Sequence, residues 1–143
     1  FGPEKVRFGY LSQFFYSMLD TLTLCQFVFG PAWTLYGPKE TVDMVNAVTG
    51  WDVTLAELMT LGERRLNMLR AFNAREGFTK AEDVLPEKFF EPLEGKRVNE
   101  DMVVDRELLA AALDQYYTEL EWTENGNPTP EKLAALGLSW IPA

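Results

Sequence analysis

The sequence predicts an all-α fold, a compact multi-helix domain with long connecting loops. Apolar residues recur at helical spacing in several segments, and capping signals stand where those segments begin. No stretch alternates apolar and polar residues for long enough to indicate a β-sheet. A chain of 143 residues that is 47% hydrophobic and 24% charged is of the size and composition of one globular domain. We therefore interpret residues 1–143 as a single helical domain.

The clearest element is a long core helix predicted over residues 54–77. Thr54 and Glu57 have the spacing of a capping box, and Gly77 supplies a stop. Gly62 interrupts the run at a cost of about 1 kcal/mol relative to Ala, which indicates close packing by a neighbouring element. One face of this helix is expected to be apolar and to face the core, through Leu55, Leu58, Met59, Leu66, Leu69 and Phe72.

Shorter helices are predicted on either side of this element. Upstream, residues 4–19 and 39–48 have helical character. Downstream, Thr79 and Glu82 repeat the capping-box spacing, so we expect a short helix that ends before Pro86.

The C-terminal helices are predicted within residues 105–137, after a linker rich in Pro, Gly and charge at residues 91–101. The first should run over residues 105–120. The second is short: Thr129 is its expected cap, with proline in the first helical position, and Gly137 ends it. These signals complete the all-α assignment.

Composition and charge exclude several classes of function. The net charge is −9 and no stretch is rich in Lys or Arg, so a nucleic-acid partner is not expected. The sequence has no histidine, which removes the commonest acid–base residue and the usual zinc ligand. Gly-rich phosphate loops and nucleophile elbows are absent from it as well. The many Asp and Glu residues have the spacing of solvated helix faces.

Cellular context follows from the cysteine content and from the apolar segments. Cys25 is the only cysteine, so no disulfide can form within the chain. The most apolar region, residues 14–36, is interrupted by polar and helix-breaking residues, so no membrane span is expected. No signal peptide is visible, and we expect a cytoplasmic protein. The first residue is Phe and not Met, which suggests a piece of a longer polypeptide.

One local pattern stands out at residues 20–25, Asp-Thr-Leu-Thr-Leu-Cys, which lies between aromatic stretches. Taken alone, Cys25 fits a small buried hydrophobe better than a ligand, because free cysteine is among the most buried residue types. Taken alone, Asp20 fits a cap or a turn residue. The residue types by themselves therefore leave the chemistry of this segment open.

The segment resembles the Asp-x-x-Gly-Leu-Cys motif of the tungsten-containing aldehyde ferredoxin oxidoreductases. The similarity extends along nearly the whole chain in order, although its most specific blocks are structural. Gly62 to Phe78 is similar to the family's long helix and its Gly-Phe exit. Further similar blocks lie at residues 83–93, 113–117 and 125–133, together with Trp122.

The resemblance implies a role for each residue of the motif. Asp20 would accept hydrogen bonds from a pterin of a tungsten (or molybdenum) bis-pterin cofactor, and Cys25 would be the fourth ligand of one [4Fe–4S] cluster. Leu24 would contact the cofactor and shape the loop. Thr23 departs from the motif, which has Gly at that position. If the backbone there has a positive φ, the β-branched residue costs about 1–3 kcal/mol.

The resemblance also implies a function for the parent enzyme. It would oxidise a small aldehyde to a carboxylic acid and pass electrons through the cluster to ferredoxin, and it would form a homodimer. Residues 1–143 would be its C-terminal part, in contact with the N-terminal domains of the same polypeptide, which supply the remaining ligands. The isolated fragment is expected to hold no cofactor and to be inactive, with no catalytic residue of its own.

Residues 1–36 are interpreted as the cofactor-facing segment. They contain ten of the nineteen aromatic residues of the chain. Adjacent aromatics such as Phe14, Phe15 and Tyr16 cannot all face one side of a helix. Two interpretations remain open: a core helix covered by its own domain, or a surface that is buried against a preceding domain and the cofactor.

Two alternatives to the redox enzyme also remain open. The chain could be a non-catalytic helical interaction module that kept the fold and lost the chemistry, and Thr23 and the lack of histidine are compatible with this. Alternatively, Cys25 could be a redox-sensing thiol, which needs an exposed and activated side chain that the apolar surroundings disfavour. Three closely spaced cysteines upstream in the native polypeptide would favour the enzyme over the interaction module.

Overall fold

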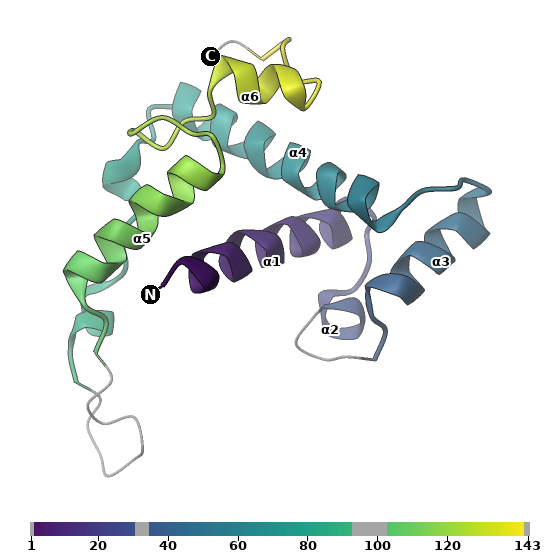
Figure 1. The fold of residues 1–143 in the computed structure, drawn as a ribbon, viewed down its shortest axis with the longest axis horizontal. Helices are drawn as coiled ribbons and strands as arrows, with labels where there is room; N and C mark the ends of the chain where they lie inside the picture. Colours follow the sequence, from purple (N-terminus) through teal and green to yellow (C-terminus); the bar gives the residue numbers. More distant parts are fainter. Residues whose placement is uncertain (1, 31–34, 93–102, 142–143) are drawn as a thin grey trace.

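The computed structural model describes residues 2–30, 35–92 and 103–141, and within these ranges the chain is all-helical, as predicted (Figure 1). No strand is found in these ranges, and an isolated bridge pairs Trp122 with Pro128. Most of the predicted linker at residues 91–101 lies outside the described residues, as do the aromatics Phe1 and Trp33. In chain order the elements are α1 (Pro3–Thr21), α2 (Gln26–Phe29), α3 (Pro38–Thr49), α4 (Leu55–Arg75), η1 (Lys80–Glu82), η2 (Glu87–Phe90), α5 (Arg106–Glu119) and α6 (Pro130–Ala135).

The predicted helix starts are confirmed by the capping contacts. The Thr54 hydroxyl accepts a hydrogen bond from the Glu57 amide at 3.3 Å, and the Glu57 carboxylate accepts one from the Thr54 amide at 2.8 Å. At Thr79 the hydroxyl accepts from the Ala81 amide at 3.2 Å and the Glu82 carboxylate accepts from the Thr79 amide at 2.6 Å, but the helix that follows is a single 3₁₀ turn, η1. At the C-terminal end, the Thr129 hydroxyl accepts from the Lys132 amide at 3.1 Å and begins α6. Local sequence therefore determines where these helices begin.

Helices α1 and α4 form the centre of the fold and cross in close contact at Gly62. A Cβ atom at Gly62 would lie 1.9 Å from the Phe14 carbonyl oxygen, so only glycine permits this approach. The close packing predicted from Gly62 is thus confirmed. Around the crossing, α1, α3 and α4 bury one hydrophobic cluster that consists of Phe15, Met18, Leu19, Val45 and Leu58.

A second, smaller core lies on the opposite side of α4. Ala71 of α4 packs there with residues in and after α6, namely Leu133, Leu136 and Leu138. Asn67 is fully buried on the same side, where its side-chain oxygen accepts a hydrogen bond from the Trp122 indole at 2.8 Å. The α4 helix is therefore covered by α1 over its first half and by the C-terminal segment over its second half (Figure 1).

The prediction that the apolar face of α4 is buried in the core was wrong for most of its residues. Of its six residues only Leu58 is buried, whereas Leu55, Leu69 and Phe72 are exposed. The reason is geometric: beyond the crossing, α1 and α4 diverge, so the later residues of this face are not covered by α1 (Figure 1). The second buried face uses small and polar residues, which a hydrophobic pattern does not reveal.

The aromatic N-terminal segment is partly core and partly surface. Phe14 and Phe15 are buried within the chain, whereas Phe8 is 62% exposed and Phe27 is 71% exposed. The interpretation as a covered core helix therefore holds for Phe14 and Phe15, and burial of the exposed aromatics against a preceding domain and the cofactor stays a prediction. In the described part of the chain, no helix combines the length and the apolar character that crossing a membrane requires.

Candidate functional site

The segment 20–25 forms the turn that ends α1 and leads into α2. The amide of Thr23 donates to the Asp20 carbonyl at 3.2 Å, and the amide of Leu24 donates to the Leu19 carbonyl at 2.9 Å. This pair of bonds is the Schellman motif, in which the residue after the cap adopts the left-handed conformation. Thr23 has φ 57°, so the position does require the conformation that glycine favours.

Leu24 supplies the hydrophobic contact that accompanies such a turn. Its half-buried side chain packs against the cluster that contains Leu19, three residues before the cap. A contact between these two positions is a usual part of the motif. Leu24 therefore fixes the direction in which the chain leaves α1.

Asp20 lies in the last turn of α1, and its carboxylate is exposed to solvent on one side. Its Oδ1 atom accepts a hydrogen bond from Gln26 Nε2 at 2.6 Å, and its Oδ2 atom lies 3.3 Å from Arg65 Nη1. The Arg65 guanidinium also donates to the Ser17 hydroxyl at 3.3 Å. Asp20 is thus held between α2 and α4 by two contacts, and no local sequence signal predicts either of them.

Cys25 is exposed and stands directly before α2 as its N-terminal flanking residue. The interpretation of Cys25 as a small buried hydrophobe was therefore wrong. The reason is that the turn at Thr23 directs Leu24, and not Cys25, into the core. Gln26, the residue after Cys25, reaches back to the Asp20 carboxylate, so the start of α2 is tied to the end of α1. Among the described residues, no group of three or more His, Cys, Asp or Glu side chains could hold a metal ion.

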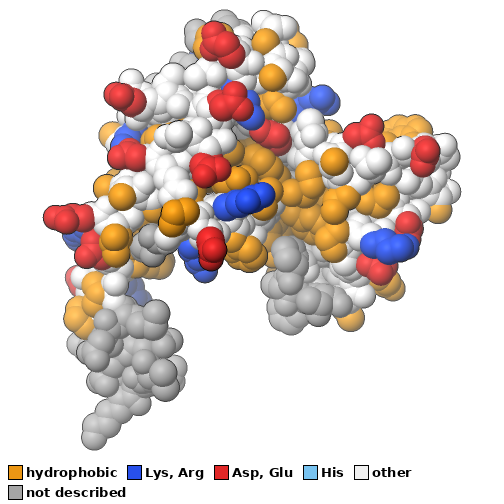
Figure 2. Space-filling model, viewed as in Figure 1, with side chains coloured by type: hydrophobic (Ala, Val, Ile, Leu, Met, Phe, Trp, Pro, Cys, Tyr) orange, Lys and Arg blue, Asp and Glu red, His pale blue; other side chains and the backbone are white. Residues whose placement is uncertain are grey.

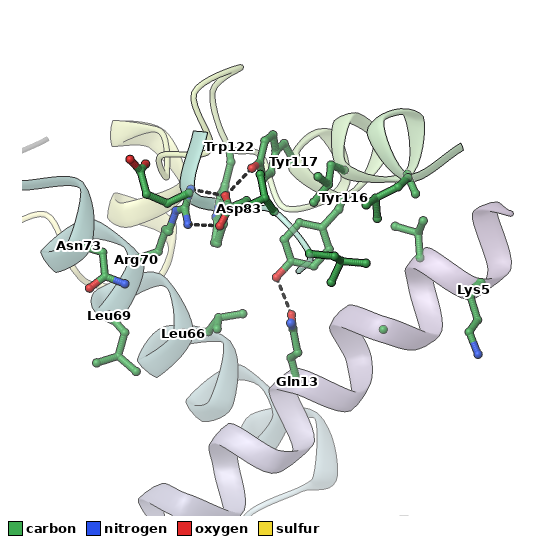
Figure 3. A pocket seen from close by; sticks show the side chains of 18 residues that line it. Lys5, Gln13, Leu66, Leu69, Arg70, Asn73, Asp83, Tyr116, Tyr117 and Trp122 are labelled. Carbon is green, nitrogen blue, oxygen red and sulfur yellow. Dashed lines mark hydrogen bonds and ion pairs between the residues drawn. The ribbon is translucent and has the colours of Figure 1, made fainter. Parts of the chain in front are cut away.

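A second candidate is a cleft of about 770 Å³ where α1, α4 and α5 diverge (Figure 3). Most of its wall is apolar and includes Leu66, Leu69 and Leu113. Between α1 and α5, the Tyr116 hydroxyl donates to Gln13 Oε1 at 2.5 Å. Burial raises the pKa of Tyr116, so this phenol stays protonated and acts as a donor.

The polar end of the cleft is a closed network around Asp83. Arg70 donates to both carboxylate oxygens, at 2.9 and 2.6 Å, and the Tyr117 hydroxyl donates to Oδ2 (Figure 3). Burial opposes ionisation of Asp83, but the hydrogen bonds from Arg70 and Tyr117 outweigh it and lower the pKa of the carboxyl. Arg70 also stacks over the Trp122 ring at 5.3 Å. These side chains bind one another, so the network stabilises the junction of α4 with α5.

The comparison with known proteins shows the family of this chain. Residues 1–138 match the family described as aldehyde ferredoxin oxidoreductase, domains 2 & 3. This chain belongs to the aldehyde ferredoxin oxidoreductase family. The resemblance of the chain to this family is thereby confirmed, whereas the roles that the motif implies for Asp20, Leu24 and Cys25 remain predictions.

The similar relatives include oxidoreductases of Pyrococcus species. The tungsten-containing aldehyde ferredoxin oxidoreductase of Pyrococcus horikoshii is 36% identical over 139 residues, which are 96% of this chain and 22% of the relative. The corresponding protein of Pyrococcus furiosus is 33% identical over 140 residues, with the same coverage. An aliphatic sulfonate oxidoreductase, WOR-like subunit, of the same organism is 30% identical over 142 residues, which are 95% of this chain and 21% of the relative. The chain spans about a fifth of the length of these relatives.

A solved structure has the same fold. It is the active site complex BamBC of benzoyl coenzyme A reductase in complex with 1,5-dienoyl-CoA, with a TM-score of 0.71 and 24% sequence identity. The likeness covers 91% of this chain and 18% of that chain. At this level of identity the likeness concerns the fold alone, and it supports the helical arrangement described above.

Proposed function

We propose that this chain is the C-terminal part of a tungsten-dependent aldehyde ferredoxin oxidoreductase and that the turn after α1 forms one side of its cofactor site. The reaction is oxidation of an aldehyde with water to a carboxylic acid, which releases two electrons to ferredoxin and two protons. The observation that carries the proposal is the geometry of residues 20–25. Asp20 and Cys25 are both accessible, and Thr23 has the backbone conformation for which the family motif uses glycine.

The side chains of this turn fit the proposed cofactor. The Asp20 carboxylate can accept parallel hydrogen bonds from the amine edge of a pterin, as carboxylates do from Arg. The exposed Cys25 can supply one thiolate to a [4Fe–4S] cluster, whose usual ligands are four cysteines. The sequence has no other cysteine, so the other ligands would come from elsewhere in the polypeptide. The bound cofactors would supply the redox chemistry, while Asp20 and Cys25 hold them side by side.

The exposed aromatic residues support contact with other domains. Within residues 1–36, Phe8 and Phe27 are each more than 60% exposed, and Figure 2 shows apolar side chains gathered across the middle of one face. Large contiguous apolar surface on a soluble protein usually marks an interaction site. We assign residues 1–36 as a segment that faces the cofactor and the N-terminal domains of the same polypeptide.

The test is aldehyde-dependent reduction of ferredoxin by the native polypeptide, purified anaerobically and compared with its Asp20→Asn variant. The amide keeps one acceptor oxygen and loses the charge, so we expect activity to fall about tenfold or more, as for residues that orient a bound group. Asp43→Asn is the matched control, because Asp43 is an exposed carboxylate of α3 paired with Lys39. A native polypeptide without aldehyde oxidation would instead be a non-catalytic helical module with the family fold.

A further inference from the structure

The Asp20 carboxylate occupies an electrostatically unfavourable position. It lies in the last turn of α1, a 19-residue helix, where the helix dipole is negative and disfavours an anion. That last turn contains no basic residue. An ionised side chain at this place therefore needs a positive charge or a hydrogen-bond donor from another element.

Two neighbouring helices supply the positive charge and the hydrogen-bond donor that α1 lacks. Arg65 of α4 places its guanidinium 3.3 Å from Oδ2, and Gln26 of α2 donates to Oδ1 at 2.6 Å. A carboxylate oxygen has about two acceptor positions, so each Asp20 oxygen keeps one position open. The carboxylate is thus fixed by two contacts and can still accept two more hydrogen bonds.

The position of Arg65 depends on the helix crossing. Gly62 lets α4 approach the backbone of α1 at Phe14, and Arg65 lies one turn further along α4. From there its guanidinium also reaches the buried Ser17 hydroxyl at 3.3 Å. Arg65 is therefore held in place by a contact other than Asp20, which favours a fixed orientation over a mobile surface ion pair.

We propose that Arg65 and Gln26 are positioning residues of the pterin site: they hold the Asp20 carboxylate in a fixed orientation, with one acceptor position open on each oxygen. This inference rests on the proposed function, in which Asp20 binds the pterin. Arg65 and Gln26 act through Asp20 and need not touch the cofactor. Removal of either contact should lower cofactor retention. Removal of both Asp20 and Arg65 should lower cofactor retention no further than removal of Asp20 alone.

The experiment measures tungsten and released pterin per chain in the anaerobically purified native polypeptide, with iron per chain as an internal reference. Arg65→Gln should lower tungsten and pterin by about tenfold, the low end of the loss typical for residues that orient a ligand. Arg65→Lys keeps the charge and should retain most of both, because the contact to Asp20 is a single one. Arg75→Gln is the matched control, since Arg75 ends α4 and pairs with the exposed Glu76.

The Asp20→Asn background separates this inference from the proposed function. There, Arg65→Gln should cause no further loss, because Arg65 acts only through Asp20. The inference is overturned if Arg65→Gln lowers tungsten and pterin in the Asp20→Asn background as much as it does in the wild type. It is also overturned if Arg65→Gln alone retains both at the wild-type level while Asp20→Asn loses them. Either result leaves the proposed function standing. Full retention in Asp20→Asn overturns both. If Arg65→Gln does not accumulate as folded protein, Gln26→Leu carries the same test, because Gln26 is exposed and lies outside the crossing.

Discussion

Replacement of Thr23 by glycine should stabilise the chain. Thr23 has φ 57° in the Schellman turn that ends α1, and its side chain is exposed, so its removal sacrifices no buried contact. A left-handed conformation costs an L-residue about 1–2 kcal/mol. Glycine avoids this cost but loses about 0.5–1 kcal/mol through its greater freedom in the unfolded chain. The expected net gain is therefore about 0.5–1 kcal/mol of unfolding free energy.

Urea unfolding followed by circular dichroism measures this gain. With a slope of about 2 kcal/mol/M, the unfolding midpoint should rise by roughly 0.3–0.5 M at an unchanged slope. Glu121→Gly is the comparison, because Glu121 has the same φ of 57° after α5 but is not β-branched, so its gain should be no larger. Gly77→Ala should lower the unfolding free energy by about 1 kcal/mol, because Gly77 has a φ of 92° that alanine adopts only with strain. The new Cβ would meet no atom within 4 Å, so the loss would come from the backbone alone. A midpoint for Thr23→Gly at or below that of the wild type would refute the strain argument.

Three further predictions concern packing, charge and surface. Gly62→Ala should lower the unfolding free energy by about 3 kcal/mol in the same urea assay, because its Cβ would lie 1.9 Å from the Phe14 carbonyl oxygen; an unchanged midpoint would contradict the crossing. The pKa of Asp83 is lowered in the folded state, so its pairing with Arg70 stabilises the fold above about pH 4 and is lost as the pH falls further. The melting-temperature difference between wild type and Asp83→Asn should thus shrink below that pH, and a constant difference from pH 7 to 2 would argue against it. Finally, the isolated chain should bind a hydrophobic dye or self-associate through residues 1–36, and a monomer that does neither would count against an interdomain surface.

Local signals in the sequence were sufficient for most helix boundaries. The hydroxyl and carboxylate of Thr54 and Glu57 are close in sequence, so their exchange of hydrogen bonds does not depend on the rest of the fold. The same holds for Thr129 and the proline that follows it. Short elements such as α2 and η2 were not predicted, because one helical turn offers neither a periodic pattern nor a cap.

Tertiary contacts explain what the sequence did not reveal. The apolar pattern of α4 did not indicate that α1 diverges beyond Gly62, nor that Asn67 would be buried against the C-terminal segment. At the site, Asp20 and Cys25 were found through a family motif, whereas Arg65 lies 45 positions beyond Asp20 and carries no motif of its own. Its contact with Asp20 exists only because the helices cross at a glycine.

The most direct test of the proposed site is the metal content of the native polypeptide, purified anaerobically, beside its Cys25→Ser variant. Iron, tungsten and molybdenum are measured per chain, and Thr23→Gly serves as a control in the same turn that keeps the thiol. The wild type should contain about four irons for one [4Fe–4S] cluster, together with tungsten, and Cys25→Ser should lose the iron. An iron content in Cys25→Ser equal to that of the wild type, or little metal in the wild type itself, would contradict the assignment of this turn as a cofactor site.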